Sequence, residues 1–267
     1  MTEKSMIEAN RELWDAWTGI NAQSDFYDLE SFRAGQSSLQ AVELEELGPL
    51  VAGKSLLHLQ CHFGLDTLSW ARLGARVTGL DLSGRAIELA RSLASDLDLD
   101  ADFICSDVLQ WRPADGQTFD IVFTSYGVLD WLPDLDAWAE VIVSALAPGG
   151  LFYMVEFHPL LNVLDDEAQM TQPYFQEGRV VQVEERGSYA DPDADFEGTS
   201  HVCFHTLGEV VSALARGGLR IEMLTEHPYS PYDCFPFTEL AEPGRAVLKG
   251  RRDKAMPLLY SLQARKQ

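Results

Sequence analysis

The sequence has few basic residues, few cysteines and no long apolar run. Its 267 residues include 20 Lys and Arg against 42 Asp and Glu, which gives a formal net charge of -22. A chain this negative repels phosphate backbones and anionic lipids, so we expect neither nucleic acid nor a membrane among its partners. No run approaches the roughly 20 apolar residues that a membrane-spanning helix needs.

The four cysteines lie too far apart in the sequence to form a CxxC motif. Such a motif is typical of zinc sites and redox centres, so we expect free thiols and no metal site. His201 and His205 flank the strand-like residues VCF, and this spacing does not favour a metal pair either. The first residues, MTEKSMIEANRELW, lack the apolar core of a secretory signal, which together with the free thiols predicts a cytoplasmic location.

The middle of the chain alternates between apolar runs typical of strands and amphipathic runs typical of helices. This alternation predicts a doubly wound α/β fold, Rossmann-like, with a mostly parallel sheet that binds ligands at the carboxyl ends of its strands. The expected strands are 55–61, 75–83, 101–108, 119–127 and 151–157, and the expected helices are 66–74, 84–97 and 135–146.

The remaining segments predict additions to this core within a single domain. Residues 1–48 are expected to form a helical cap, with helices at 8–18 and 39–47 around a loop at 21–38. The core spans 49–157. Residues 158–205 are expected to be an insertion with a short antiparallel pair around 178–189, which forms a lid over the acceptor together with 1–35. Residues 206–267 complete the sheet with a helix at 207–218, strands at 219–228 and 256–266, the last one antiparallel, and an irregular loop at 229–255.

Two acidic residues follow expected strands beside a glycine turn. Gly64 lies between the first strand and its helix, where backbone N–H groups face a ligand. Asp81 ends the second strand, 17 residues later, and Asp107 follows the third. One acid is placed to accept ribose hydroxyls and the other to bind an adenine amino group. The alternative is that both are turn residues, Asp81 capping the next helix together with Ser83.

Several motifs in this order resemble class I S-adenosylmethionine-dependent methyltransferases. They are LLHLQCHFG, GLDLS, CSDV, FDIVFTSYGVL and LAPGG, and the resemblance covers about residues 50–157. It implies S-adenosylmethionine as the cofactor and in-line methyl transfer to a small-molecule acceptor. The cofactor contacts that it implies, with Tyr27 from the N-terminal segment added, are Gln60, Cys61, His62, Gly64, Asp81, Leu82, Ser106, Asp107, Val108, Ser125, Tyr126 and Tyr27.

The first motif departs from the family pattern. His58 stands where the family has an acid, and Gln60 and His62 stand where it has glycines. We interpret this as a variant cofactor turn. The His62 side chain is expected to face the pocket and bind the cofactor carboxylate, or otherwise to stack on Trp14 or Tyr27.

Methyl transfer needs a base only where the acceptor must lose a proton. The candidates are His158 and Glu156 after the fifth strand and Tyr126 after the fourth, with His201 and His205 as weaker candidates. Aromatic residues outside the core are expected to surround the acceptor and to suit a neutral or cationic molecule. They are Trp14, Tyr27, Phe32, Trp131, Tyr229, Tyr232 and Phe235.

Two other functions remain open. A nicotinamide-dependent oxidoreductase would use the same sheet, although the GxGxxG fingerprint is missing. A non-catalytic S-adenosylmethionine-binding protein would explain the altered turn. Enzymes that methylate DNA amino groups are disfavoured, because the fourth strand ends in Thr124-Ser125-Tyr126-Gly127 and not in a Pro-Pro motif. The oligomeric state is expected to be a monomer or a homodimer.

Overall fold

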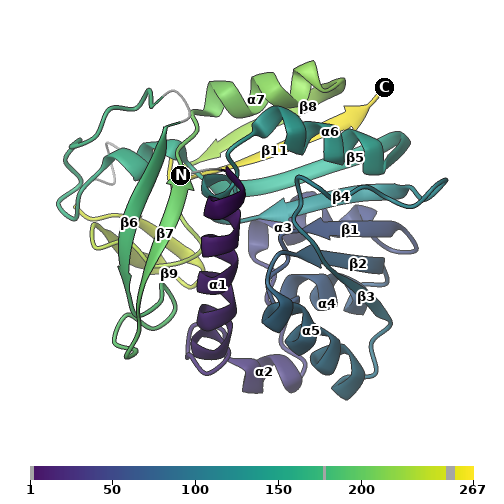
Figure 1. Ribbon diagram of the computed structural model, residues 1–267, viewed down its shortest axis with the longest axis horizontal. Helices are drawn as coiled ribbons and strands as arrows, with labels where there is room; N and C mark the ends of the chain where they lie inside the picture. The colour runs from purple at the N-terminus through teal and green to yellow at the C-terminus, as the bar shows by residue number, and fades with distance from the viewer. Residues whose placement is uncertain (1–2, 177–178, 251–255) are drawn as a thin grey trace.

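The computed structural model describes residues 3–176, 179–250 and 256–267, and its centre is a seven-stranded sheet (Figure 1). The sheet has the order β3-β2-β1-β4-β5-β11-β8, in which β11 is antiparallel to both of its neighbours and the other pairs are parallel. This confirms the predicted fold, including the antiparallel last strand. The strands are β1 (Ser55–Leu59), β2 (Arg76–Asp81), β3 (Ala101–Cys105), β4 (Phe119–Ser125), β5 (Leu146–Phe157), β8 (Leu219–His227) and β11 (Leu259–Lys266).

The expected core elements are all present, and the largest difference in their bounds is at β5. This strand begins at Leu146 and not at residue 151. Leu146 already pairs with Phe119 of β4, and an irregularity in the register then brings Leu151 opposite Ile121. The residues of the predicted Pro-Gly-Gly turn therefore belong to the beginning of β5.

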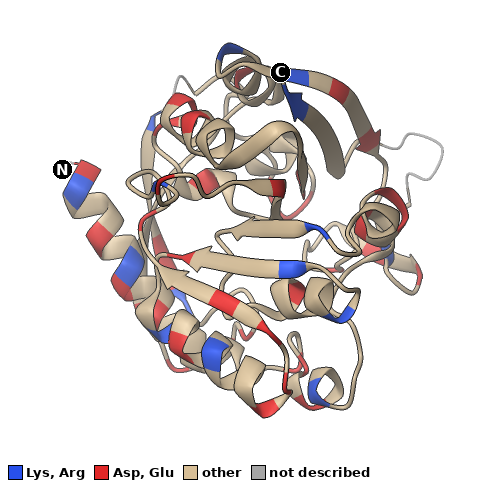
Figure 2. Ribbon diagram, turned by 90° about the vertical axis from the view of Figure 1, so that its right-hand side faces the viewer, with Lys and Arg blue, Asp and Glu red and all other residues tan. Residues whose placement is uncertain are grey.

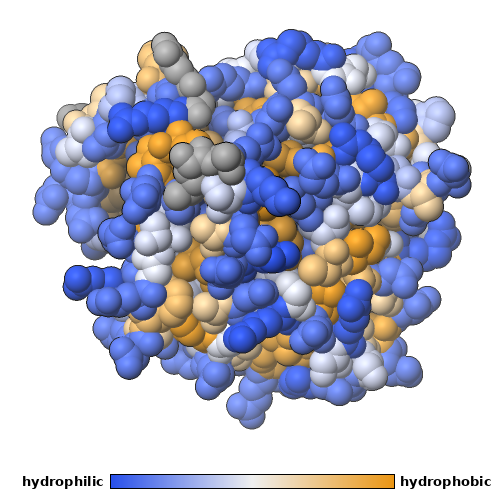
Figure 3. All heavy atoms as spheres, in the orientation of Figure 1, coloured by the Kyte–Doolittle hydropathy of each residue, from blue (hydrophilic) through white to orange (hydrophobic). Residues whose placement is uncertain are grey.

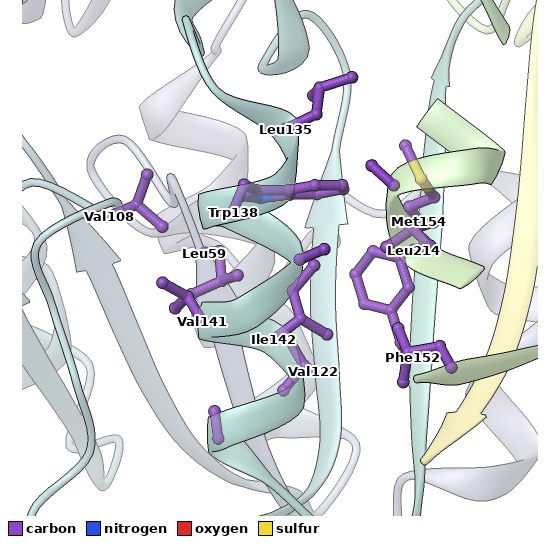
Figure 4. Packing of buried hydrophobic residues seen from close by; sticks show 14 of the residues in the cluster. Leu59, Val108, Val122, Leu135, Trp138, Val141, Ile142, Phe152, Met154 and Leu214 are labelled. Atoms are coloured by element: carbon purple, nitrogen blue, oxygen red, sulfur yellow. The ribbon is translucent and has the colours of Figure 1, made fainter. Parts of the chain in front are cut away.

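Helices cover both faces of the sheet. One face packs against α6 (Leu135–Ala145) and α7 (Leu207–Arg216), and the other against α3 (Ala41–Glu46) and α4 (Leu65–Arg72). Figure 4 shows Trp138 and Ile142 of α6 pointing into the layer between this helix and the strands, and both are fully buried. Removing such a buried aromatic side chain typically costs about 3–5 kcal/mol, so this layer contributes much of the stability. The remaining helix of the core, α5 (Gly84–Asp96), packs on β2 and β3.

The N-terminal region is more helical than expected. The first helix, α1 (Glu3–Asn21), extends beyond the predicted range at both ends, and α2 (Leu29–Arg33) lies inside the predicted loop 21–38. Asp28 stabilises α2 because its side chain accepts a hydrogen bond from the Ser31 N–H at 3.1 Å. A helix of five residues is too short to produce the periodicity on which the prediction rested.

The segment after β5 contains the expected antiparallel pair with a different second strand. Residues of β6 (Val180–Arg186) pair with β7 (Glu197–Cys203), and this hairpin lies beside α1 (Figure 1). The prediction of an irregular loop at 229–255 is wrong, because this segment contains the hairpin of β9 (Thr238–Glu242) and β10 (Arg245–Leu248). Residues 251–255 of that prediction lie outside the described residues. The described residues also contain the short 3-10 helices η1 (Gly48–Leu50), η2 (Leu129–Trp131) and η3 (Pro159–Val163).

The surface reflects the composition of the chain. Acidic residues outnumber basic ones over the view in Figure 2, and Figure 3 shows apolar patches separated by hydrophilic side chains. All four cysteines are free thiols. In the described part of the chain, the helices are too short or too polar to cross a membrane.

Candidate functional site

A cavity of about 810 Å³ opens at the carboxyl ends of β1, β2, β4 and β5. Its volume lies in the range of about 300–1,000 Å³ that is typical of small-molecule sites. The core strands and the turns after them form one part of its wall. The rest comes from α1 and the residues after it, from η2 and η3, and from the loops that follow β6 and β8. Segments far apart in the sequence therefore enclose one space.

The turn between β1 and α4 is tightly constrained. Gly64 is the N-cap of α4 with φ +78°, and a Cβ there would lie 2.6 Å from Cε1 of Phe103. Gln60 and His62 also have positive φ, at 57° and 50°. Such values cost a non-glycine residue about 1 kcal/mol or more, so these two residues retain a backbone shape that suits glycine.

Asp81 joins this turn to the end of β2. Its carboxylate accepts hydrogen bonds from the N–H groups of His62 at 2.7 Å and Ser83 at 2.8 Å. Burial raises the pKa of Asp81 to about 6, against the lowering effect of these bonds. The cap of α5 is Ser83 and not Asp81, since the Ser83 hydroxyl accepts from the Ala86 N–H. Each oxygen of Asp81 keeps a free lone pair for a ligand.

The residues predicted to contact a cofactor all line this cavity. Asp107 follows β3 by two residues, and its carboxylate accepts a hydrogen bond from the Leu109 N–H at 2.9 Å. Partial burial raises its pKa. Tyr126 has φ 33° directly after β4, and burial together with the nearby Glu43 carboxyl raises the pKa of its hydroxyl. The other predicted residues on the wall are Tyr27, Gln60, Cys61, His62, Gly64, Asp81, Leu82, Ser106, Val108 and Ser125.

His62 both lines the cavity and packs beneath the N-terminal segment. Its ring centroid lies 5.3 Å from that of Trp14 and 5.5 Å from that of Tyr27. The Asn21 amide donates to Nε2 at 3.1 Å, so the ring proton lies on Nδ1, which has no partner in the described structure. Burial lowers the pKa of His62 to about 3, so the imidazole is neutral. His62 therefore contacts Trp14 and Tyr27 edge to face rather than by stacking, and it also lines the cavity, so both predicted positions of the ring remain compatible with the structure.

Of the three predicted bases, Tyr126 and Glu156 line the cavity and His158 does not. His158 does not line the cavity, and its Nε2 lies 2.9 Å from a carboxylate oxygen of Glu226. Glu156 lines it, but its carboxylate accepts the backbone N–H groups of residues 127–129 and so holds the turn into η2. This geometry does not support His158 as a base that contacts an acceptor, and it gives Glu156 a structural task.

The two weaker candidate bases, His201 and His205, also differ in whether they line the cavity. His205 lines the cavity and its Nε2 bonds to the Leu132 carbonyl at 2.7 Å, whereas His201 bonds to Asn10 through its backbone and lies outside the cavity wall. Within the described residues, no group of three or more His, Cys, Asp or Glu side chains is placed to hold a metal ion.

Most of the aromatic residues that were predicted to surround the acceptor line the cavity. Tyr229 lies outside the cavity, because its ring packs against the Arg245 guanidinium at 4.2 Å. The residues of the predicted set that line it are Trp14, Tyr27, Phe32, Trp131, Tyr232 and Phe235.

Several polar residues of the cavity wall were not predicted from the sequence. Asp130 in η2 lies 3.1 Å from the Asn162 amide of η3, and burial raises its pKa to about 7. Asp66 in the first turn of α4 accepts from the hydroxyls of Ser38 at 2.6 Å and Ser125 at 3.3 Å. Their neighbours in the sequence carry no signal, because their partners come from distant segments.

Comparison with known proteins identifies relatives of the core. Residues 56–150 match the family model described as a methyltransferase domain. The chain is 33% identical over 110 residues to a ubiquinone biosynthesis O-methyltransferase of Methylobacterium sp., which covers 41% of this chain and 43% of that protein. It is 32% identical over 101 residues to the enzyme of that name from Coxiella burnetii, with 38% and 42% covered. The match thus spans less than half the length of these curated relatives.

Solved structures extend the likeness to almost the whole chain. The complex of DhpI with SAH has a TM-score of 0.58 at 21% identity and covers 99% of this chain and 98% of that one. The PH0226 protein of Pyrococcus horikoshii has a TM-score of 0.59 at 17% identity, with 94% and 95% covered. At these identities the likeness establishes the fold.

Proposed function

We propose that this chain, whose core is a class I S-adenosylmethionine-dependent methyltransferase domain, transfers a methyl group from that cofactor to a small organic acceptor. One observation carries the proposal: the residues that the family motifs assign to the cofactor all meet on one cavity at the carboxyl ends of the strands. The curated relatives and the solved structures of this fold support the same reaction class.

The polar groups of the cavity fit the cofactor. Asp81 and Asp107 present carboxylate oxygens at the ends of neighbouring strands, where they would accept the ribose hydroxyls and the adenine amino group. At the β1–α4 turn, Nδ1 of His62, Nε2 of His58 and Oε1 of Gln60 are buried without a partner in the described structure. Buried polar groups are normally satisfied, so these atoms are suited to the charged amino-acid end of the cofactor.

The bound cofactor would supply a methyl group on a positively charged sulfur, which needs no further activation. The protein then has to orient the acceptor in line with that methyl group and to exclude water, which can contribute about 7–11 kcal/mol. Residues from α1 and from the segment 158–205 close the cavity over the strand ends, among them Trp14, Asn162 and Tyr189. We assign to these segments the role of a lid.

A titration with S-adenosylhomocysteine, followed by calorimetry, tests the cofactor assignment. We expect saturable binding at one site per chain and no binding of reduced nicotinamide cofactors, which fluorescence would detect. Methyl transfer to a set of small acceptors, measured by mass spectrometry, then separates an enzyme from a non-catalytic binding protein. The reverse pattern of cofactor binding would support the oxidoreductase alternative.

A further inference from the structure

The wall of the cavity has charges of one sign. Lys and Arg residues are absent from it as far as the structure describes the chain, and its histidines, His58, His62 and His205, have pKa values lowered by burial. Its acidic residues are Asp28, Asp66, Asp81, Asp107, Asp130, Glu156 and Glu185. Such a wall favours cationic ligands and repels anionic ones.

Asp130 lies in η2, five residues beyond the end of β4, and its carboxylate oxygens can accept more hydrogen bonds than they receive in the structure. Its two carboxylate oxygens share a single donor, the Asn162 amide, at 3.1 and 3.2 Å. Its neighbour Glu156, by contrast, is engaged with several backbone N–H groups. A carboxylate offers about four lone-pair sites, so Asp130 can accept further hydrogen bonds from a ligand.

An independent feature of the same end of the cavity is the hydroxyl of Tyr260. This residue lies on β11, forms part of the cavity wall and has no exposed surface (0%). Its hydroxyl has no hydrogen-bond partner among the described residues, and Asp130 and Glu156 lie close enough to raise its pKa beyond the effect of burial. A buried hydroxyl without a partner costs about 1–3 kcal/mol, and a ligand group that bonds to it would recover that cost.

We infer that the methyl acceptor is an amine, whose nitrogen binds between the Asp130 carboxylate and the Tyr260 hydroxyl while Asn162 orients Asp130. The inference rests on the proposed function and adds the substrate class. An ammonium group matches both the acids and the aromatic rings of this cavity, such as that of Trp131, which attract cations through their faces. A carboxylate or phenolate acceptor would instead be placed against Asp130 and Glu156.

The amine, the cofactor and Asp130 account for every proton and bond that this reaction moves. The amine arrives as an ammonium ion and gives one proton to the Asp130 carboxylate. Its freed lone pair then forms the N–C bond as the S–C bond of the cofactor breaks, and the sulfur leaves as a neutral thioether. The positive charge moves from sulfur to the product nitrogen, which the acids continue to stabilise. The raised pKa of Asp130 suits this proton transfer near neutrality, and the titratable groups that face it are Glu156, Tyr260 and Cys203.

Calorimetry in the presence of S-adenosylhomocysteine tests the inference with matched probes: 2-phenylethylamine against 2-phenylethanol, and benzylamine against benzyl alcohol. We expect each amine to bind about tenfold more tightly than its alcohol, or ~1.4 kcal/mol. Asp130→Asn should abolish this preference and leave the affinity for S-adenosylhomocysteine unchanged. The matched control is Asp136→Asn, which removes an exposed acid paired with Arg216 and should leave the preference intact.

Tyr260→Phe tests the second group without removing a charge. It should weaken amine binding about fivefold or more, because the amine loses its hydrogen bond to this hydroxyl. The melting temperature should not fall, because the hydroxyl makes no hydrogen bond to the described part of the chain. Circular dichroism and S-adenosylhomocysteine binding verify that both variants fold.

Equal affinity for amines and alcohols, or an amine preference that survives Asp130→Asn, would overturn the inference. Methylation of hydroxyl groups without methylation of any amine would overturn it as well, although the proposed methyltransferase function would stand. Failure of the wild-type protein to bind S-adenosylhomocysteine is the separate result that would overturn that function.

Discussion

The two sides of the cavity are built in different ways. The proposed nucleoside side, formed by the β1–α4 turn with Asp81 and Asp107, comes from successive strand–turn–helix units, and its acids accept backbone N–H groups close in the fold. The acceptor side, formed by η2, η3, β11 and the β6–β7 hairpin, comes from segments up to 130 residues apart, Asp130 to Tyr260. There the Tyr260 hydroxyl has no hydrogen-bond partner among the residues that the structure describes.

This contrast separates two tasks. Polar groups held by backbone N–H groups have a fixed position before any ligand binds, which suits a cofactor that is the same in every turnover. Polar groups that can still form hydrogen bonds are satisfied by the ligand that binds next to them. This suits the methyl acceptor, whose recognition would determine substrate specificity. Substitutions on the nucleoside side should therefore affect cofactor binding and stability, and those on the acceptor side should affect the choice of substrate.

The largest effect should come from Asp81→Ala. The variant removes the predicted acceptor of the ribose hydroxyls and also the tie between the β1–α4 turn and β2. Hydrogen bonds to a charged group contribute about 1.5–3 kcal/mol each, so the affinity for S-adenosylhomocysteine should fall by about 100-fold or more in calorimetry. Asp102→Ala, an exposed acid on β3, is the control. Unchanged affinity in Asp81→Ala would contradict the assignment of Asp81 as the acceptor of the ribose hydroxyls.

Gly64→Ala should have the next largest effect, measured as the free energy of unfolding in urea. Its φ of +78° strains any other residue, and the new Cβ would lie 2.6 Å from the Phe103 ring. We expect a loss of about 2–3 kcal/mol. Gly53→Ala isolates the backbone contribution and should lose only about 1 kcal/mol. Gly53 has φ +74°, and among the described residues other than its two chain neighbours no atom lies within 4 Å of its Cβ position. Equal losses would mean that the contact with Phe103 is unimportant.

The nucleoside side is also the part that the sequence predicts well. Gly64 and Asp81 lie within 17 residues of each other on either side of one helix, so strand periodicity alone places both at the same edge of a sheet. The same strand pattern places Asp107, and the resemblance to the family adds Ser125. The backbone contacts of Asp81 and Asp107 lie within 19 residues in the sequence, whereas the Ser125 hydroxyl reaches the more distant Asp66.

The acceptor side could not be predicted in the same way. Tyr260 reaches the cavity because β11 inserts between β5 and β8, a placement that no local pattern encodes. Asp130 follows a strand, as Asp107 does, but its role depends on Asn162 and on Tyr260. The position of His158 directly after β5 predicts a base at the cavity, but the structure pairs it with Glu226 of β8 instead. Long-range strand order decided these three cases.

A smaller effect is expected for His62→Gly, which lies where the two sides meet. Glycine keeps the N–H group that bonds to Asp81 and removes the strain of φ +50°, so the stability should change little. The variant loses the Nδ1 donor and the ring contacts with Trp14 and Tyr27. We expect the affinity for S-adenosylhomocysteine to fall about tenfold, or ~1.4 kcal/mol. Unchanged or improved affinity would show that the imidazole only fills space beneath the N-terminal segment.

The smallest effect is expected from pH, through Asp81. Burial, with a smaller contribution from the Asp15 carboxylate of α1, raises its pKa to about 6, and ribose hydroxyls need the ionised form as their acceptor. About a quarter of the carboxyl groups are ionised at pH 5.5 and nearly all at pH 7.5, so the affinity for S-adenosylhomocysteine should be about fourfold weaker at the lower pH.

The sign of this pH effect is opposite to that on folding. A carboxyl whose pKa is higher in the folded than in the unfolded protein favours the folded state at low pH, and this contribution is lost as the pH rises through about 6. Weaker binding at pH 5.5 therefore cannot be attributed to unfolding caused by Asp81. Asp81→Asn removes the titration, so its affinity should be lower than that of the wild type at pH 7.5 and constant between the two values. The pKa of His62 lies near 3, outside this range. A pH dependence that persists in Asp81→Asn would assign the titration to another group and leave the nucleoside side without its proposed anchor.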